Sequence, residues 1–494
     1  MNVADGLAHW AARTPYQVAV LEDGGTTSFR ALDEAVWHAI QYFREGGIRP
    51  GTVTGIGGDR SGTLQLVASF ALARMGAIQV PLSPSDPPLR HKEIIERTGV
   101  QAFVGQRSAG RTDSAASLAL DPSWLNPRRP PASRSGTTID GDSIWMINHS
   151  SGTTGRPKAM AISHAIEAAR IARQPPEFAS RPGERFMSLT SFDFWVGLSR
   201  AMRCLSDGGT VVVAPRLLTL TNTLEAIERH NVTHLSCTPK NLFDMLSGLK
   251  GAAVRLPGVR VMRVSTAALP PTVLAKARTQ ISPNIYTNYG TNEAGGFAVA
   301  TPDMLEQAPQ SVGKLLPGVE LELVDDQGKP VPTGETGFVR VRAEGMIAGY
   351  VGDSEATAKA FRDGWFYAGD MAAFDDAGFL YLKGRTDEMM NYDGMLVSPL
   401  EIERVLLEHP AVADAAAIAL PSDRHQDIPA AAVVLRQQID FAALNAHCAS
   451  RLGIRTPPVL LMFDELPRNR IGKVLKNELV AKAQAILAKR RENS

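Results

Sequence analysis

Strand-like and helical segments alternate through the first half of the chain, and this alternation constrains the fold more than any other feature. Strands are expected at residues 51–57 and 77–81, with a helix at residues 62–75 between them. The same order continues with elements expected at residues 210–213, 220–229, 232–237, 240–249 and 259–265. Strands that alternate with helices form βαβ units with a parallel sheet. The sequence therefore predicts an α/β fold.

A different pattern begins after about residue 311. Residues 319–324 and 338–342 alternate apolar and polar side chains, and the turn-forming residues 325–328 lie between them. This alternation is typical of antiparallel strands with one solvated face. Earlier in the chain, residues 107–140 are rich in Ser, Arg, Pro, Ala and Gly, so we expect a surface loop or a poorly ordered connector there.

The C-terminal part of the chain predicts a separate small domain. The elements expected there are helices at residues 399–407 and 441–452 and strands at residues 415–420 and 430–435. A chain of 494 residues is too long for one compact core. We therefore predict a large multi-sheet N-terminal domain of βαβ units (residues 1–386) and a small α+β C-terminal domain (residues 387–494), joined by a hinge.

Charge and hydropathy exclude several classes of protein. The net charge is +1 and the pI is about 7.8, so no overall field favours nucleic acid or an anionic membrane. Residues 64–77 are apolar but interrupted by polar side chains, which favours a buried helix over a membrane span. Cys204, Cys237 and Cys448 lie far apart and fit no zinc pattern, and the N-terminus lacks a signal-peptide pattern. We expect a cytoplasmic protein with reduced cysteines.

The most informative short segment is residues 149–158, His-Ser-Ser-Gly-Thr-Thr-Gly-Arg-Pro-Lys, which follows a strand expected at residues 143–147. Its small residues allow backbone N–H groups to turn toward one point, and its hydroxyl groups and lysine add donors and charge. Such a loop suits polyphosphate oxygens, although it is not a Walker A loop. A flexible surface loop is the alternative. The candidate phosphate-binding residues are Ser150, Ser151, Gly152, Thr153, Thr154, Gly155 and Lys158.

This segment resembles the phosphate loop of the adenylate-forming superfamily, which comprises acyl-CoA and aryl-CoA ligases, peptide-synthetase adenylation domains and firefly-type luciferases. The resemblance extends over about residues 20–480 and includes four further motifs in the order found in the superfamily. They are Tyr289-Gly290-Thr291-Asn292-Glu293, Tyr367-Ala368-Gly369-Asp370, Gly384-Arg385-Thr386-Asp387 and the string from Leu466 to Lys473. The last motif is more similar to acyl-CoA ligases than to peptide-synthetase domains.

The resemblance implies a role for each motif. Tyr289 would stack on adenine, with Gly290 and Thr291 beside the nucleotide, and Glu293 would hold Mg²⁺. Asn292 stands where the superfamily has threonine, and its amide can still donate to a phosphate or carboxylate oxygen.

Three charged residues complete the implied site. Asp370 would bind the ribose hydroxyls, Arg385 would contact ribose or phosphate, and Asp387 would be the hinge. Lys473 would be the catalytic lysine, lying between the incoming carboxylate and the α-phosphate of ATP. Fixed positive charge is needed at this point because two anions must meet.

The resemblance also indicates where the acid would bind. The candidate residues are Asp193, Phe194, Trp195, Ala268 and Gly295. Phe194 and Trp195 would form a compact wall that favours a small or aromatic acid. Asp193 needs a partner if it is buried, and that partner is either a substrate ammonium or a group of the protein itself.

The leading hypothesis is a two-step ligase that uses ATP and Mg²⁺ to form an acyl-adenylate and then transfers the acyl group to CoA. A free-standing enzyme that loads an amino acid or another acid onto a separate carrier protein is the main alternative. A nucleotide-binding scaffold without catalysis and an oxidative light-emitting enzyme are more remote. No nucleic acid or membrane partner is expected, and a homodimer is considered.

Overall fold

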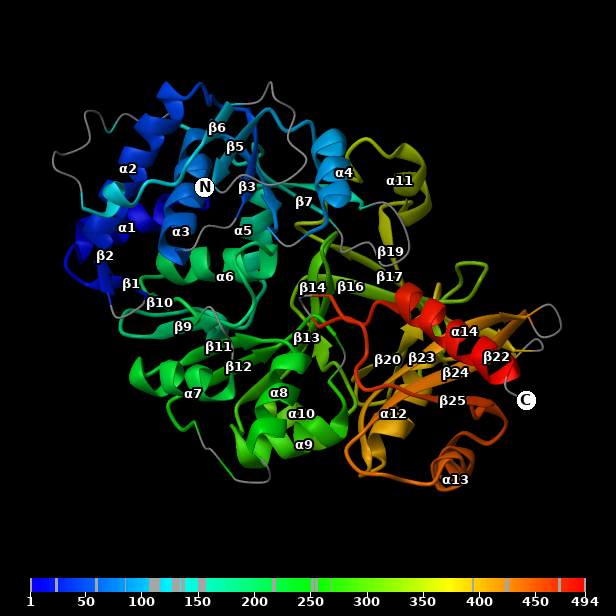
Figure 1. The fold of residues 1–494 in the computed structure, drawn as a ribbon. Coiled ribbons are helices and arrows are strands. Elements are labelled where there is room, and N and C mark those ends of the chain that lie inside the picture. The colour runs from blue at the N-terminus through cyan, green and yellow to red at the C-terminus, as the bar shows by residue number, and fades with distance from the viewer. Residues whose placement is uncertain are drawn as a thin grey trace.

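The computed structural model describes residues 2–22, 25–57, 61–84, 86–105, 116–126, 134, 138–149, 157–215, 219–249, 253, 256–267, 269–392, 395–422, 426–469 and 472–492. Figure 1 shows a large N-terminal part and a smaller C-terminal part beside it, coloured orange and red. None of the helices within these residues is both long enough and apolar enough to cross a bilayer.

Nine of the described strands form the largest sheet. In spatial order they are β15 (Lys314–Leu315), β14 (Gly295–Ala300), β13 (Ile285–Thr291), β12 (Val261–Val264), β11 (His234–Cys237), β9 (Arg185–Ser188), β10 (Thr210–Val212), β1 (Val18–Glu22) and β2 (Gly25–Ser28). The central strands from β13 to β1 are parallel, whereas β2, β14 and β15 pair antiparallel at the edges. The parallel sheet predicted from the alternating pattern is confirmed.

A second sheet contains six described strands. They are β6 (Ala116–Leu118), β5 (Ala102–Gly105), β3 (Val53–Gly57), β4 (Ile78–Leu82), β7 (Ile144–His149) and β8 (Ala159–Ser163), of which only β8 pairs antiparallel. The expectation of a loop over residues 107–140 was therefore wrong in part. Strand β6 adds to the free edge of β5, and Trp124 of the short 3₁₀ helix η1 (Pro122–Leu125) packs its ring against Tyr42 and Phe43.

The helices of the large part cover these sheets. They are α1 (Asp5–Arg13), α2 (Phe29–Glu45), α3 (Gly62–Met75), α4 (Pro88–Thr98), α5 (His164–Ala172), α6 (Trp195–Ser206), α7 (Leu220–Arg229), α8 (Pro239–Leu249), α9 (Pro271–Gln280), α10 (Pro302–Gln307) and α11 (Ser354–Ala360), with a 3₁₀ turn η2 (Pro176–Phe178). Helix α3 is almost wholly buried, including its polar residues Gln65 and Ser69. Its residues join one core cluster with Ile56 and Met146 of the second sheet and Val20 and Val211 of the first.

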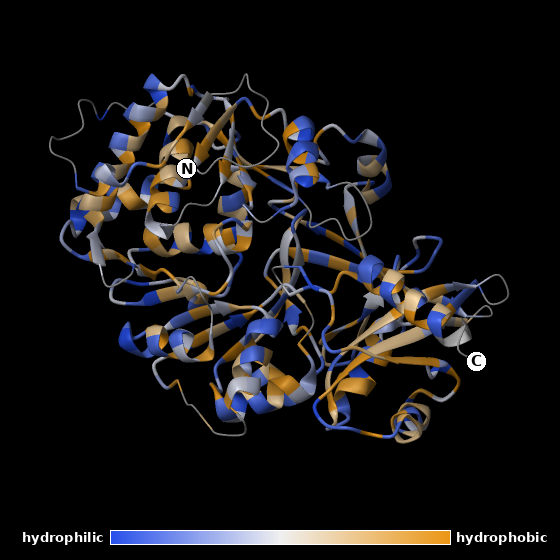
Figure 2. Ribbon diagram, viewed as in Figure 1, coloured by the Kyte–Doolittle hydropathy of each residue, from blue (hydrophilic) through white to orange (hydrophobic). Residues whose placement is uncertain are grey.

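A third sheet and the small C-terminal part complete the fold. The third sheet contains β16 (Val319–Val324), β17 (Gly337–Ala343), β18 (Phe361–Arg362), β19 (Trp365–Phe374) and β20 (Leu380–Arg385), all antiparallel. The small part contains β21 (Met390–Tyr392), β22 (Met395–Val397), β23 (Val412–Ser422), β24 (Gln426–Leu435) and β25 (Val459–Met462), with helices α12 (Pro399–Glu408), α13 (Phe441–Leu452), α14 (Lys476–Glu492) and η3 (Gly453–Arg455). Apolar residues concentrate along the strands and the inner helix faces of both parts (Figure 2).

The α/β class and the small α+β part are thus confirmed. Strand β20 ends the third sheet at Arg385, and β21 begins the next sheet at Met390. The proposed division between residues 386 and 387 falls in this connection, and the exact boundary remains a prediction.

Candidate functional site

A cleft of about 2060 Å³ is lined by strand ends of the large sheet, by the third sheet and by a loop of the small C-terminal part. We call the region around residues 290–293, Asp370 and Arg385 the motif end. The region around Trp195, Arg200 and Arg263 is called the arginine end. Residues of both regions line this cleft.

The tight turn between β13 and β14 presents Asn292 and Glu293 to the cleft. A Cβ on Gly290 would lie 2.2 Å from the carbonyl oxygen of Gly295, so the strands can approach this closely only without a side chain. Arg170 of α5 donates through Nη2 to the carbonyl oxygens of Asn292 and Glu293, each at 3.0 Å. Arg173, one helical turn later, donates to the carbonyl of Ala294. Two arginines therefore fix the turn, and sequence reasoning missed both.

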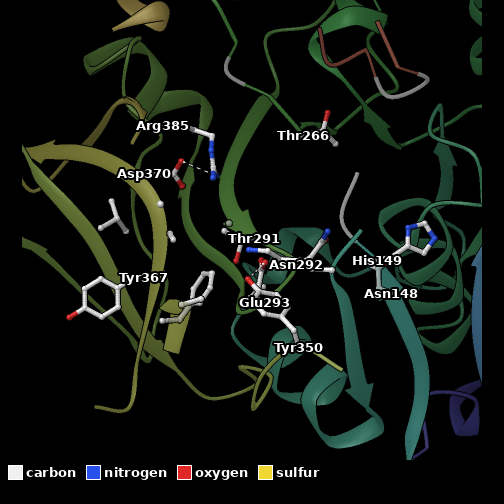
Figure 3. A pocket seen from close by; sticks show the side chains of 18 of the residues that line it. Asn148, His149, Thr266, Thr291, Asn292, Glu293, Tyr350, Tyr367, Asp370 and Arg385 are labelled. Carbon is white, nitrogen blue, oxygen red and sulfur yellow. Dashed lines mark hydrogen bonds and ion pairs between the residues drawn. The ribbon is translucent and has the colours of Figure 1, made fainter. Parts of the chain in front are cut away.

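Glu293 shares its carboxylate with a tyrosine. The Tyr350 hydroxyl donates to Glu293 Oε1 at 2.9 Å, and the two side chains point toward each other in Figure 3. Burial and the neighbouring Glu293 raise the pKa of Tyr350, so the phenol remains a proton donor. Lys158 Nζ lies 4.7 Å from the centre of the Tyr350 ring. Tyr350 lies outside the five motifs, yet it contacts residues of two of them, Lys158 and Glu293.

The donor set at Glu293 fits a hard cation that is bound mainly by another ligand. Within the described ranges, no group of three or more His, Cys, Asp or Glu side chains is placed to hold a metal ion. Mg²⁺ is usually held by one or two carboxylates together with substrate phosphates and water. A lone carboxylate oriented by Tyr350 fits that arrangement.

Three charged groups are linked beside the third sheet. Arg385 donates through Nε and Nη2 to the carboxylate of Asp387, at 2.8 and 3.2 Å, and its Nη1 lies 3.7 Å from Asp370 Oδ1. Figure 3 shows Asp370 and Arg385 facing each other. Burial raises the pKa of Asp370, and the carboxylates around Arg385, Asp387 first, raise the pKa of Arg385.

The side chain of Tyr289 has partners within the protein. Its side chain is 7% exposed, its ring packs edge-on against Phe297, and its hydroxyl donates to Asp370 Oδ2 at 2.6 Å. The structure thus gives Tyr289 a role in orienting Asp370. Stacking of its ring on adenine remains a prediction.

Lys473 lies in the loop between β25 and α14 and lines the cleft. Arg468 anchors this loop because its Nη2 donates to both carboxylate oxygens of Asp414, each at 2.7 Å. The Asn469 side chain accepts the backbone N–H of Lys473 at 2.9 Å. Burial lowers the pKa of Lys473, and the charge of Glu388 partly opposes this.

The loop is seated directly on the large part of the molecule. Gly472 has φ +82°, and a Cβ at this position would lie 2.7 Å from Cβ of Lys240 on α8. Elsewhere along the same seam, Arg404 Nη1 donates to Gln310 Oε1 at 2.7 Å. The two parts therefore meet in an arrangement that brings Lys473 to the same cleft as Glu293.

The residues predicted to bind the acid are only partly brought together. Asp193, Phe194, Trp195 and Gly295 line the cleft. Asp193 accepts hydrogen bonds from Gln65 (3.2 Å) and Ser191 (2.8 Å), so its carboxylate does not depend on a substrate ammonium. The predicted phosphate-binding residues 150–155 and Ala268 lie outside the described residues.

The arginine end was not anticipated from the sequence. Arg200 of α6 donates through Nη1 to Ser236 Oγ at 2.6 Å, and Arg263 of β12 donates to Gln174 Oε1 at 3.1 Å. Burial lowers the pKa of Arg200 to about 10 and also lowers the pKa of Arg263. Each residue looks like an ordinary surface charge in the sequence, and no short motif links them.

Comparison with known proteins agrees with this geometry. The sequence model described as AMP-binding enzyme matches residues 7–351, and that of the AMP-binding enzyme C-terminal domain matches residues 401–473. The chain is 31% identical over 359 residues to the 3-hydroxybenzoate–CoA/4-hydroxybenzoate–CoA ligase of Thauera aromatica, covering 70% of this chain and 68% of that protein. It is 27% identical over 488 residues to the phosphinothricin tripeptide synthetase PhsC of Streptomyces viridochromogenes, covering 95% of this chain and 44% of that protein.

The fold is also similar to solved structures. The anthranilate CoA ligase AuaEII in complex with anthranoyl-AMP superimposes with a TM-score of 0.89 at 24% identity, covering 99% of this chain and 98% of that one. A family match over more than two thirds of the chain and the paired C-terminal match lead to one conclusion: the chain belongs to the family of AMP-binding enzymes, and the predicted resemblance to adenylate-forming enzymes is confirmed.

Proposed function

We propose that this protein activates a carboxylic acid with ATP, forming an acyl-adenylate and releasing pyrophosphate, and then transfers the acyl group to the thiol of CoA. The observation that carries the proposal is the convergence of Lys473, Glu293, Asp370 and Arg385 on one cleft. The similarity to a hydroxybenzoate–CoA ligase supports CoA as the acceptor.

The chemistry follows from charge. A carboxylate oxygen must attack the α-phosphate of ATP, so two anions approach each other. The Lys473 ammonium would lie between them and offset the negative charge that grows on the phosphate oxygens in the transition state. Asp370 would accept hydrogen bonds from the ribose hydroxyls, and Arg385 would hold the ribose or a phosphate. Mg²⁺ bound by Glu293 would supply charge that helps pyrophosphate leave.

The fixed turn at Asn292 and Glu293 supports this assignment. Because Arg170 binds the main-chain oxygens of both residues, the turn does not depend on the side chain at position 292. An asparagine in place of the usual threonine is therefore compatible with the same backbone. Its amide would donate to a phosphate or carboxylate oxygen.

A free-standing enzyme that loads a carrier protein is the second candidate, and the similarity to PhsC favours it. The hydrogen bonds that Asp193 accepts from Gln65 and Ser191 weaken the case for an amino-acid substrate. The three cysteines are buried and form no disulfides, which supports a cytoplasmic location. A homodimer remains a prediction, which light scattering would test.

Pyrophosphate release, measured with ATP, Mg²⁺ and a panel of carboxylic acids, tests the proposal. We expect release that depends on an added acid, followed by thioester formation with CoA. Thioester formed only on a holo carrier protein would favour the second candidate. Absence of acid-dependent release for every acid class would overturn adenylation itself.

A further inference from the structure

Two arginines meet around one serine at the arginine end of the cleft. Ser236 on β11 and Arg263 on β12 are register partners in adjacent parallel strands, so their side chains leave the same face of the sheet side by side. Arg200 reaches the same point from helix α6 and donates to Ser236 Oγ at 2.6 Å. Two guanidinium groups are thus gathered from separate elements.

Neither guanidinium has an acidic partner among the residues that the structure describes. In the part of the chain that the structure describes, Arg200 and Arg263 form no ion pair with a carboxylate, and Arg263 Nε has no hydrogen-bond partner. Arg263 instead lies 3.8 Å from the centre of the Phe178 ring. Arg74, which is also shielded from solvent, pairs with Asp33 at 2.6 Å. Desolvated charges are costly unless they are paired, so an unpaired couple needs an explanation.

Two carboxyl groups that line the cleft, those of Asp193 and Glu167, interact with residues other than Arg200 and Arg263. Asp193 accepts from Gln65 and Ser191. Burial raises the pKa of Glu167, and the cations that oppose this are Arg170 and Arg203. Both carboxyl groups line the cleft, but the charges of Arg200 and Arg263 remain available to a ligand in it.

The position of the arginine pair matches the far end of a bound acid. Arg263 is the register partner of Tyr286 on β13, four residues before Gly290. At 3.3 Å per residue, the backbone positions of Tyr286 and Gly290 are about 13 Å apart along the strand. The reacting carboxylate would lie near residues 290–292. An aromatic ring or a chain of several carbons is therefore needed to carry a second charged group from the reacting end toward the arginines.

We propose that Arg200 and Arg263 form an anion-binding subsite in the acid pocket, and that the preferred substrate is a carboxylic acid with a second carboxylate at its remote end. This inference rests on the proposed function and names its substrate class. The planar guanidinium binds a carboxylate through two parallel hydrogen bonds, and two such groups neutralise a charge that an apolar pocket would exclude. Ser236 orients one of them.

The test compares each dicarboxylic acid with its own monomethyl ester. The pairs are built on adipate, suberate, isophthalate and terephthalate, and kcat/KM is measured by pyrophosphate release. For at least one pair we expect the wild-type enzyme to prefer the diacid by about 10- to 100-fold, because a charged hydrogen-bonded contact is lost in the ester. In Arg200→Gln and Arg263→Gln that ratio should fall toward one.

The ratio within one variant is unaffected by the fraction of it that folds. Arg229→Gln, an exposed arginine on α7, is the matched control and should keep the wild-type ratio. Esters that react as well as diacids in every pair, or variants that slow both members equally, would overturn the subsite. If no acid reacts, the proposed function fails. In that case, thermal-shift assays measure the binding of each diacid to the wild-type protein and to the two arginine variants. Equal binding to all three proteins would overturn the subsite.

Discussion

The two ends of the cleft differ in whether their charged side chains have partners within the protein. At the motif end each charged group has a partner within the protein: Tyr289 and Arg385 for Asp370, Asp387 for Arg385, and Tyr350 for Glu293. At the arginine end, two guanidinium groups lack a carboxylate among the described residues. In the proposed function, the motif end is preorganised for ATP, which is the same for every acid. The charges of the arginine end would be neutralised only by the bound acid. Variants at the first should affect all acids alike, and variants at the second should depend on the acid.

The largest effect is expected for Lys473→Ala, which removes the cation that the proposed mechanism places between the carboxylate and the α-phosphate. Loss of one preorganised donor costs roughly 100- to 1000-fold in rate, and this loss should be similar for every acid. Pyrophosphate release measures it, and a thermal unfolding curve checks the fold. Lys482→Ala, an exposed lysine on α14, is the control. Unchanged release in Lys473→Ala would remove this lysine from the mechanism.

Asp387→Pro should separate the two half-reactions. Proline fixes φ at the proposed hinge, so the small domain would reorient less easily for thiol transfer. We expect thioester formation to slow by about tenfold, or roughly 1.4 kcal/mol, with adenylation largely retained. Asp387→Asn removes the charge but not the backbone freedom and serves as the control. Equal loss of both steps would count against a hinge at this position.

Tyr350→Phe tests whether the motif end is held by its own partners. The change removes the hydroxyl that orients Glu293, and loss of such a supporting hydrogen bond weakens a metal site by about tenfold or more. The Mg²⁺ concentration that gives half-maximal pyrophosphate release should rise for every acid. Tyr381→Phe removes a comparable bond to Asp375 (2.9 Å) and should leave this concentration unchanged. If the change in this Mg²⁺ concentration differed from one acid to another, the two ends of the cleft would not act independently.

The smallest effect concerns pH. Burial lowers the pKa of Lys473, so this side chain loses its proton, and with it the positive charge, at a lower pH than an exposed lysine. Adenylation should therefore fall as the pH rises through that depressed pKa. Lys473→Arg should lack this alkaline fall, whatever its rate, because a guanidinium stays protonated. A profile of kcat/KM against pH that is identical in both enzymes would assign the fall to another group.

Features that are specified by neighbouring residues or by a known motif could be predicted from the sequence. Local patterns located α3, α7 and α13 and the hairpin of β16 and β17, since each is specified by consecutive residues. The resemblance located Glu293, Asp370, Arg385 and Lys473, and all four line the cleft.

The remainder depends on tertiary contacts. Arg170 of α5 contacts the turn at residues 292–293, more than a hundred positions away, and Arg200 and Arg263 approach each other only because α6 covers the strand pair β11 and β12. Strand β6 was missed because an edge strand of three residues has no periodicity to read. Sequence spacing cannot reveal such pairs.

Gly472 offers a way to separate the two half-reactions of the enzyme experimentally. Its missing side chain is what allows the lysine-bearing loop to sit flush against α8, so Gly472→Ala would insert a one-carbon spacer at the seam. The protein would then keep its pockets and its lysine but hold them apart. If Lys473 acts as proposed, we expect this variant to form little acyl-adenylate and still to accept a ready-made mixed anhydride for transfer to the thiol.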